Sequence, residues 1–330
     1  MKNLANSVTN KGTAPDEGPQ AEMQKSKIDS VTIIYVPLYF GGRHRGTSMG
    51  PAAMRVAELS EHIEAMGWKV AGEIDINVPN SLCWWDRHES QPKCVPEITQ
   101  ISQEVASAVE GALLNNTIPI TIGGDHSLAI GSIAGVSNYY RRSAQSFGLV
   151  WFDAHGDINT PETTHSGNVH GMPFAVALGK GDKRLTEINS YSPKVEAHRS
   201  VLIGIRDLDP EERDIINSTG VTAFTIRDID HLGLGRVTDL ALGAVGSDVS
   251  GIHLSFDLDV MDPDIAPGVS TPARGGLNYR EVNLAFTLLA ESQLVRSIDF
   301  VELNPAFDIQ NRTAELTVEL AMACLGNRIL

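Results

Sequence analysis

The fold is decided by the stretch Phe147-Gly148-Leu149-Val150-Trp151-Phe152-Asp153-Ala154-His155-Gly156-Asp157, where an apolar run leads directly into three polar side chains. Residues 147–152 contain β-branched and aromatic members, which predicts a buried strand. Alternate residues of an extended segment share one face, so we expect Asp153, His155 and Asp157 to point into one pocket. Such a cluster would be costly to desolvate unless a divalent cation neutralised it.

Two further strand-like runs end in the same kind of residue. Ile118-Pro119-Ile120-Thr121-Ile122 is followed by Gly123-Gly124-Asp125-His126-Ser127, and Ile252-His253-Leu254-Ser255-Phe256 is followed by Asp257-Leu258-Asp259. In open parallel α/β sheets, ligands bind at the carboxyl ends of the strands. Three strands that deliver carboxylate or imidazole there predict a metal-assisted active site.

Strand-like and helix-like segments alternate along the chain without a break in composition. This pattern predicts a single α/β domain, residues 29–330, with a mostly parallel sheet covered on both faces. Residues 1–28 are rich in polar residues, Gly and Pro, so we expect a disordered arm. The predicted strands are 31–36, 68–76, 118–122, 147–152, 201–205, 221–225, 252–256 and 294–301. The predicted helices are 51–63, 96–115, one from 128, 173–178, one around 240, 278–289 and 313–325.

Composition excludes several classes of partner. The 330 residues carry a formal net charge of −15, which disfavours nucleic acid and anionic membranes. The same charge mildly favours a cationic substrate, although solubility explains it equally well. No window approaches the roughly 20 apolar residues that span a membrane, and the N-terminus lacks the apolar core of a signal peptide.

The cysteine count indicates a reducing compartment. Cys83, Cys94 and Cys324 show no metal-binding or redox spacing. We therefore expect a cytoplasmic protein with three unpaired cysteines, and a Cys83–Cys94 disulfide is the less favoured alternative.

The segment that follows the first motif carries a family resemblance. The sequence Asp157-Ile158-Asn159-Thr160-Pro161-Glu162-Thr163-Thr164-His165-Ser166-Gly167-Asn168-Val169-His170-Gly171 resembles the arginase branch of the ureohydrolases, the family of arginases, agmatinases and related guanidino-group hydrolases. With the other two motifs, the resemblance extends from about residue 31 to the C-terminus. It implies a three-layer α/β/α sandwich and a metal-dependent amidinohydrolase that converts L-arginine to L-ornithine and urea.

The candidate ligands outnumber the needs of one ion. Two imidazoles and four carboxylates suit two divalent cations of the Mn²⁺ type, and Ni²⁺, Co²⁺, Fe²⁺ or Zn²⁺ also fit such donors. A pair of ions can hold a water molecule and lower its pKa towards neutrality. By resemblance, Asp153 and Asp257 bridge the two ions. The resemblance assigns His126, Asp153, Asp157 and Asp257 to one ion and Asp153, His155, Asp257 and Asp259 to the other.

Three residues are expected to take part in catalysis: Asp157, His170 and Glu302. The resemblance makes His170 a histidine of proton transfer, and it makes Glu302 the carboxylate that faces the guanidinium. Expulsion of an amine requires a proton, so an acid near the leaving nitrogen is needed. For Asp125, a hydrogen bond that supports the ligand cluster or its water and a proton-shuttle role are equally good hypotheses. Asp262 is expected to shape its loop.

The resemblance also implies the residues that read the substrate. Neutral donors suit an α-carboxylate and acids suit an α-ammonium group. The matching positions are Asn159, Thr164, Ser166, Asn168, Asp209, Glu212 and Thr271.

Two departures from the arginase pattern keep the substrate open. Residues 41–48 and the Trp84-Trp85 loop differ from the usual arginase sequence and are expected to line the entrance. Agmatine, guanidinobutyrate, free guanidine or an N-alkylated biguanide such as metformin is the alternative substrate, and a non-catalytic partner subunit is the alternative class. Relatives suggest a homo-oligomer, a trimer or hexamer, with a hetero-oligomer containing a paralogue as a further alternative.

Overall fold

The computed structural model describes residues 28–79 and 92–327, and one eight-stranded sheet organises them. The strand order is β2-β1-β3-β8-β7-β4-β5-β6, and every adjacent pair is parallel. The eight predicted strands are confirmed to within two residues at each end. They are β1 Ser30–Val36, β2 Lys69–Asp75, β3 Ile118–Gly123, β4 Gly148–Phe152, β5 Ser200–Ile205, β6 Thr222–Thr225, β7 Ile252–Asp257 and β8 Val295–Val301.

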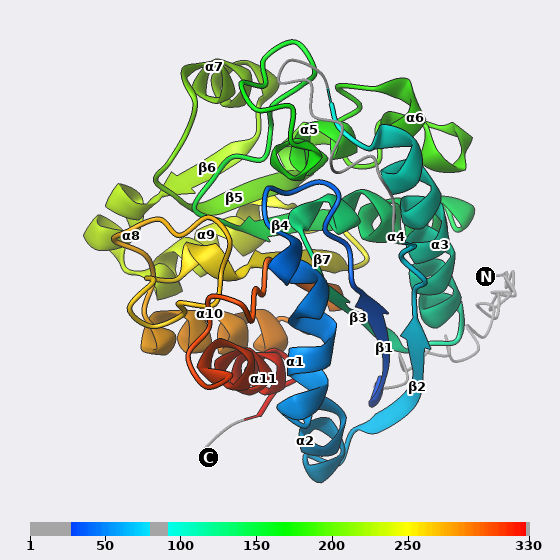
Figure 1. Cartoon of the computed structure of the whole chain (residues 1–330), viewed down its shortest axis with the longest axis vertical. Helices are drawn as coiled ribbons and strands as arrows, with labels where there is room; N and C mark the ends of the chain where they lie inside the picture. The colour runs from blue at the N-terminus through cyan, green and yellow to red at the C-terminus, as the bar shows by residue number, and fades with distance from the viewer. Residues whose placement is uncertain (1–27, 80–91, 328–330) are drawn as a thin grey trace, which may run out of the picture.

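Helices cover both faces of this sheet, which confirms the three-layer α/β/α prediction. In Figure 1 the strands run from β2 at the lower right to β6 at the upper left, with α3, α4 and α5 on one side and α9, α10 and α11 on the other. The helices are α1 Gly50–Val56, α2 Leu59–Ala65, α3 Val95–Leu114, α4 Ala129–Arg142, α5 Pro173–Ala177, α6 Lys183–Thr186, α7 Pro210–Thr219, α8 Ile226–Leu232, α9 Leu234–Ala244, α10 Tyr279–Glu291 and α11 Arg312–Cys324.

Burial on both faces explains the continuous apolar runs of the strands. All residues of β3, β4, β5 and β7 are buried. On one face, Phe152 of β4 and Phe256 of β7 pack against Phe286 of α10. On the other face, Trp151 packs edge-on against Phe174 of α5. The two apolar layers hold the strands in register and so set the positions of the residues that follow them.

Some helices differ from the sequence prediction. The helix expected over 51–63 is two helices, because Glu58 takes a left-handed conformation (φ 56°, ψ 41°) between α1 and α2. The helix α7 was not predicted, although Asp209 and Glu212 form a reciprocal capping box at its start. Asn278 does cap α10, as expected, with Glu281 completing the capping box.

One expectation about the cysteines is wrong. Cys94 is disulfide-bonded, and Cys324 is free and buried; Cys83 lies outside the described residues. The expectation was drawn from the frequency of disulfides in different compartments, which does not determine whether two particular thiols are within bonding distance. Across residues 28–79 and 92–327, no helix combines the length and apolar character that crossing a membrane requires.

The strand order brings the three motifs together. β3, β8, β7 and β4 are consecutive neighbours, so the segments after them meet at one carboxyl edge. Gly124 makes the tight turn after β3, because its φ of +67° and a built Cβ only 2.5 Å from the Val36 carbonyl oxygen exclude other residues.

Candidate functional site

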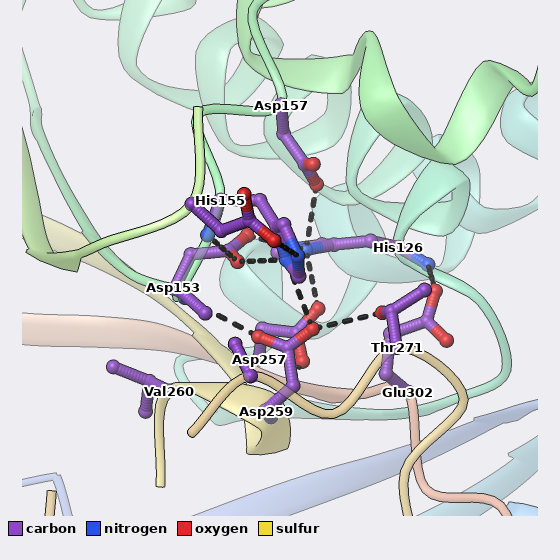
Figure 2. Close-up of polar contacts among 12 residues, drawn as sticks. His126, Asp153, His155, Asp157, Asp257, Asp259, Val260, Thr271 and Glu302 are labelled. Atoms are coloured by element: carbon purple, nitrogen blue, oxygen red, sulfur yellow. Dashed lines mark hydrogen bonds and ion pairs between the residues drawn. The ribbon is translucent and has the colours of Figure 1, made fainter. Parts of the chain in front are cut away.

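Three carboxylates surround one imidazole nitrogen at the carboxyl edge (Figure 2). The Nδ1 atom of His126 lies 3.3 Å from Asp153 Oδ2, 3.0 Å from Asp157 Oδ2 and 3.1 Å from Asp257 Oδ2. The side chains of all four residues are largely or wholly buried. Within the described residues, this nitrogen makes no hydrogen bond. The arrangement is therefore a set of ligand atoms that converge on one point.

A second group of donors lies beside the first. His155 Nδ1 is 3.1 Å from Asp259 Oδ2 and 3.4 Å from Asp153 Oδ1. Donor atoms of His126, Asp153 and Asp257 lie within 4.8 Å of one another, as do those of Asp153, His155 and Asp259, and Asp153 belongs to both sets. All six predicted ligands thus lie together. Asp153 is the residue that the two sets share, whereas Asp257 belongs to the first set alone, and the bridging roles of both residues stay predictions.

The donor groups fit divalent cations. Burial, reinforced by Asp153, raises the pKa of Asp157 to about 7, and burial with Asp259 and Asp153 raises the pKa of Asp257 well above its usual range. Positive charge at the centre of the cluster would reverse both effects. Adjacent donors that each lie about 2.1 Å from one ion are about 3 Å apart, which matches the separations around His126.

Neighbouring side chains orient the ligands. Ser255 Oγ lies 2.9 Å from His126 Nε2 and so directs the opposite ring nitrogen towards the carboxylates. Trp151 donates its indole N–H to Asp153 Oδ2 at 2.9 Å, and its ring stacks on His126 with centroids 4.0 Å apart. Neither residue was predicted from the sequence to take part in the site. A signal was available, because each stands two positions before a ligand on its own strand and so shares that ligand's face.

Asp157 points towards His126 for a different reason from the one predicted. This residue lies outside β4 and has a left-handed backbone (φ 47°), so strand alternation does not place it. Its carbonyl oxygen accepts the backbone N–H of Phe174 at 2.9 Å. The turn onto α5, rather than an extended segment, therefore directs this carboxylate to His126.

His170 and Glu302 form a buried pair beside the ligands. His170 Nδ1 lies 3.0 Å from Glu302 Oε1, which also accepts the backbone N–H of His126 at 3.0 Å. Burial lowers the pKa of His170, but the bond to Glu302 and the nearby carboxylates outweigh it and raise the value to about 9. His170 lines the cavity described below, and Glu302 is not among its lining residues. The structure thus places Glu302 against His170, and its predicted contact with a guanidinium stays a prediction.

Asp125 anchors a loop. Its Oδ2 accepts the backbone N–H groups of Gly41 at 2.9 Å and Gly42 at 3.3 Å, and its Oδ1 accepts the N–H and hydroxyl of Ser127. Four hydrogen bonds thus hold this carboxylate in place. They favour neither of the two roles expected for Asp125, support of the ligand cluster or its water and proton shuttling. Asp262 accepts the N–H groups of Asp264, Gly275 and Gly276, and so shapes its loop in the way expected.

A cavity of about 180 Å³ opens beside the ligands. Five of the residues predicted to read the substrate line it: Asn159, Ser166, Asp209, Glu212 and Thr271. Thr164 and Asn168 do not line it. Thr164 Oγ1 accepts the N–H of Gly167 at 3.0 Å, and Asn168 Oδ1 accepts a hydrogen bond from Lys93. Thr271 donates to Asp259 Oδ2 at 2.9 Å and so orients a ligand.

Two acids form one wall of this cavity. Glu212 is 5% exposed and accepts the N–H groups of Asp209 at 3.0 Å and Ile158 at 3.3 Å. Burial raises the pKa of Glu212 to about 7. Asn159 donates to Asp209 Oδ2 at 3.0 Å. This wall attracts a cationic group, since Asp209 adds its own carboxylate.

Lys93 supports the segment that contains Ser166, and the sequence did not predict this role. Its backbone N–H donates to the Gly167 carbonyl at 3.0 Å, and its ammonium donates to Asn168 Oδ1 at 3.1 Å and to the Ser166 carbonyl. The contact joins segments 73 residues apart, so no local pattern could have predicted it.

The glycine-rich loop 41–48 does not line the cavity. Gly41 accepts the backbone N–H of His170 at 3.2 Å, Arg45 lies over the Tyr39 ring at 4.8 Å, and His44 meets Phe307 edge-on at 5.2 Å. The cavity therefore does not support the expectation that this loop forms the entrance, and Asp125 holds the loop by the N–H groups of Gly41 and Gly42. The Trp84-Trp85 loop lies outside the described residues.

Comparisons with known proteins agree with this geometry. The model of the arginase family matches residues 29–326. Arginase from Bacillus caldovelox is 40% identical over 300 residues, which cover 91% of this chain and 99% of that protein. A solved structure of Bacillus caldovelox arginase superimposes with a TM-score of 0.87, at 39% identity over 92% of this chain and 100% of its own. Entamoeba histolytica arginase in complex with L-ornithine gives a TM-score of 0.81 at 28% identity, over 91% and 100% of the two chains.

Proposed function

The chain belongs to the arginase family, and from that premise we propose that it hydrolyses L-arginine to L-ornithine and urea. The observation that carries the proposal is the pair of buried donor groups that share Asp153 next to an acid-walled cavity. A cationic guanidine fits such a cavity, since its charge opposes that of the lining carboxylates.

We assign the two donor groups to two divalent cations. His126, Asp153, Asp157 and Asp257 would hold one, and Asp153, His155, Asp257 and Asp259 the other. Nitrogen and oxygen donors without thiolate favour Mn²⁺, with Ni²⁺ or Co²⁺ as the next choices. Bound there, the ions would make a water molecule nucleophilic near neutral pH and neutralise the developing charge.

The chain's own residues supply the proton chemistry. Addition of water to the guanidinium carbon and cleavage of the C–N bond expel an amine, which needs a proton. The hydrogen bond to Glu302 raises the pKa of His170 and so favours its protonated form. Its Nδ1 is held by Glu302, so Nε2 is the atom that would give the proton to the leaving nitrogen.

The lining residues support recognition of an amino-acid head group. Asp209 and Glu212 suit the α-ammonium, and Asn159 and Ser166 suit the α-carboxylate. Because Thr164 and Asn168 do not reach the cavity, recognition of the carboxylate would depend on fewer groups than the resemblance implied. Agmatine, which lacks the carboxylate, is therefore the most informative competitor.

The test is urea release from a panel of guanidines by Mn²⁺-loaded protein. L-Arginine should have the highest kcat/KM among L-arginine, agmatine, guanidinobutyrate, guanidine and metformin. A preference for agmatine or metformin would reject the arginine assignment and keep the hydrolase. No urea from any compound, with two ions bound per chain, would favour the non-catalytic partner subunit.

Assembly and location stay predictions. We expect a homo-oligomer, a trimer or a hexamer, and mass photometry of the full chain distinguishes the two. A cytoplasmic location remains the expectation, although the disulfide at Cys94 removes the argument from cysteine chemistry.

A further inference from the structure

A second cavity lies at the opposite, amino-terminal edge of the sheet. It has a volume of about 550 Å³, within the usual range of small-molecule sites. Its walls come from the C-terminal end of α4, from residues 144–147 ahead of β4 and from residues 191–199 ahead of β5. No residue of the arginase site takes part in it.

Two cations share one aromatic ring in this cavity. The Arg141 guanidinium lies 4.2 Å and the Lys194 ammonium 4.3 Å from the centroid of the Tyr191 ring. Lys194 is 6% exposed and donates to the carbonyls of Thr186, at 2.8 Å, and Tyr191. Among the residues that the structure describes, neither cation forms an ion pair with a carboxylate. Two positive charges therefore meet at one ring, and the nearest carboxylates, such as Glu187, act on them only at a distance.

Two further observations indicate an incomplete site. The Tyr191 hydroxyl is buried and makes no hydrogen bond within residues 28–79 and 92–327. Burial, together with Arg141, lowers the pKa of Lys194 to about 8. Buried polar groups are normally satisfied, and buried cations are normally paired.

Arg141 differs from two neighbouring arginines, which form ion pairs with carboxylates. Arg142 also lies in the last turn of α4, and it pairs with Glu110 at 2.5 Å. Arg199, on the cavity wall, pairs with Glu196 at 2.6 Å and Asp248 at 2.7 Å. The carbonyl end of α4 attracts Arg141 and Arg142 alike, so it does not explain why only one of them has a carboxylate.

We propose that this second cavity binds a small organic anion, a carboxylate or a phosphate monoester with an apolar body. Arg141 offers a planar fork that matches either head group, and Lys194 adds a point charge. Tyr140 and Phe147, whose rings are 5.8 Å apart, line the cavity and would contact the apolar body.

Isothermal titration calorimetry on the full, metal-loaded chain tests the proposal with three probes. Benzoate and phenyl phosphate carry the two head groups, and benzamide is the neutral match for benzoate. We expect saturable binding of at least one anion and none of benzamide at the same concentration. Arg141→Gln should weaken that binding about tenfold or more, the usual effect of losing a charge-assisted hydrogen bond. The matched control Arg142→Gln should leave it unchanged.

The result also distinguishes this cavity from the metal centre, which can itself attract anions. Affinity that persists in Arg141→Gln, equal binding of benzamide, or no saturable binding of either anion would each overturn the proposal. Lys194→Met should also weaken binding; if that variant does not fold, Arg141→Gln decides, because Arg141 is exposed. The better of the two anions identifies the head group.

Discussion

The two edges of the sheet gather charges of opposite sign. At the carboxyl edge, three carboxylates surround the Nδ1 atom of His126. At the amino edge, Arg141 and Lys194 lie against one tyrosine ring. Helix α4 connects them, because it begins three residues after His126 and ends at Arg142. Like charges that lie close together are stabilised by a counter-charge, so each edge favours a ligand of the opposite sign.

The edges differ in how their charges are built. The acids follow β3, β4 and β7, which are held by the packed core on both faces. The cations come from one helix end and one surface segment. We therefore expect the carboxyl edge to be rigid and sensitive to substitution of its buried ligands, and the amino edge to tolerate changes at Arg141.

The largest effect should come from removing the carboxylate shared by both donor groups. Asp153→Ala should abolish metal binding and urea release together, because Asp153 is the member common to the two groups. Metal content by mass spectrometry and activity on L-arginine are the measurements. Asp207→Asn, which changes an exposed carboxylate 3.9 Å from His155, is the control and should retain both. Full activity in Asp153→Ala would contradict the ligand assignment.

The next largest effect should come from Ser255, which lies on β7 and contacts the ligand His126. Ser255→Ala removes the partner of His126 Nε2 and should weaken Mn²⁺ binding about 10- to 100-fold, as loss of such orienting groups does. Ser297 lies on the adjacent strand, is fully buried, and makes no side-chain hydrogen bond within the described residues. Ser297→Ala is therefore the matched control. Equal affinities of the two variants would show that Ser255 does not orient the ligand.

Most of the carboxyl edge was predictable from the sequence, because its strands and the ligands that follow them are close together along the chain. The apolar runs of β4 and β7 lead directly into ligands, and the run of β3 ends shortly before His126. The other five strands were found from their apolar runs alone. Helix α7 was missed because its only fully buried residue is Glu212, so it lacks the apolar periodicity on which helix prediction depends. The capping signal of Asp209 and Glu212 was present but was interpreted as substrate recognition alone.

The amino edge was not predictable, because its contacts are long-range. Arg141 and Tyr191 meet across 50 positions of sequence, and nothing near either residue indicates the other. The turn at Glu58 is similar: its left-handed backbone divides a continuous amphipathic pattern. Such features depend on the packing of whole elements, which periodicity does not describe.

Lys194 at the amino edge should make the free energy of unfolding depend on pH. Lys194 in the folded protein loses its proton near pH 8, and in the unfolded chain near the ordinary 10.5. Between these values the unfolded state binds more protons, so the free energy of unfolding should rise with pH. The expected gain is on the order of 1–3 kcal/mol, and it should be absent in Lys194→Met. Urea unfolding at pH 8 and 10 measures this gain. If the free energy of unfolding changes equally with pH in the wild type and in Lys194→Met, the lowered pKa of Lys194 is contradicted.

The smallest effect should come from Lys93, a cation at the carboxyl edge that holds the segment containing Ser166. Lys93→Met keeps the length of the side chain and the backbone bond to Gly167 but loses the ammonium contacts to Ser166 and Asn168. We expect KM for L-arginine to rise about three- to tenfold, the effect of one or two hydrogen bonds, with kcat nearly unchanged. Agmatine has no carboxylate for Ser166 to read, so its KM should stay constant. Lys180→Met, an exposed lysine, controls for the loss of charge. A matching rise in KM for agmatine would mean that Lys93 supports the cavity as a whole, and the carboxylate would then have to be read by Asn159.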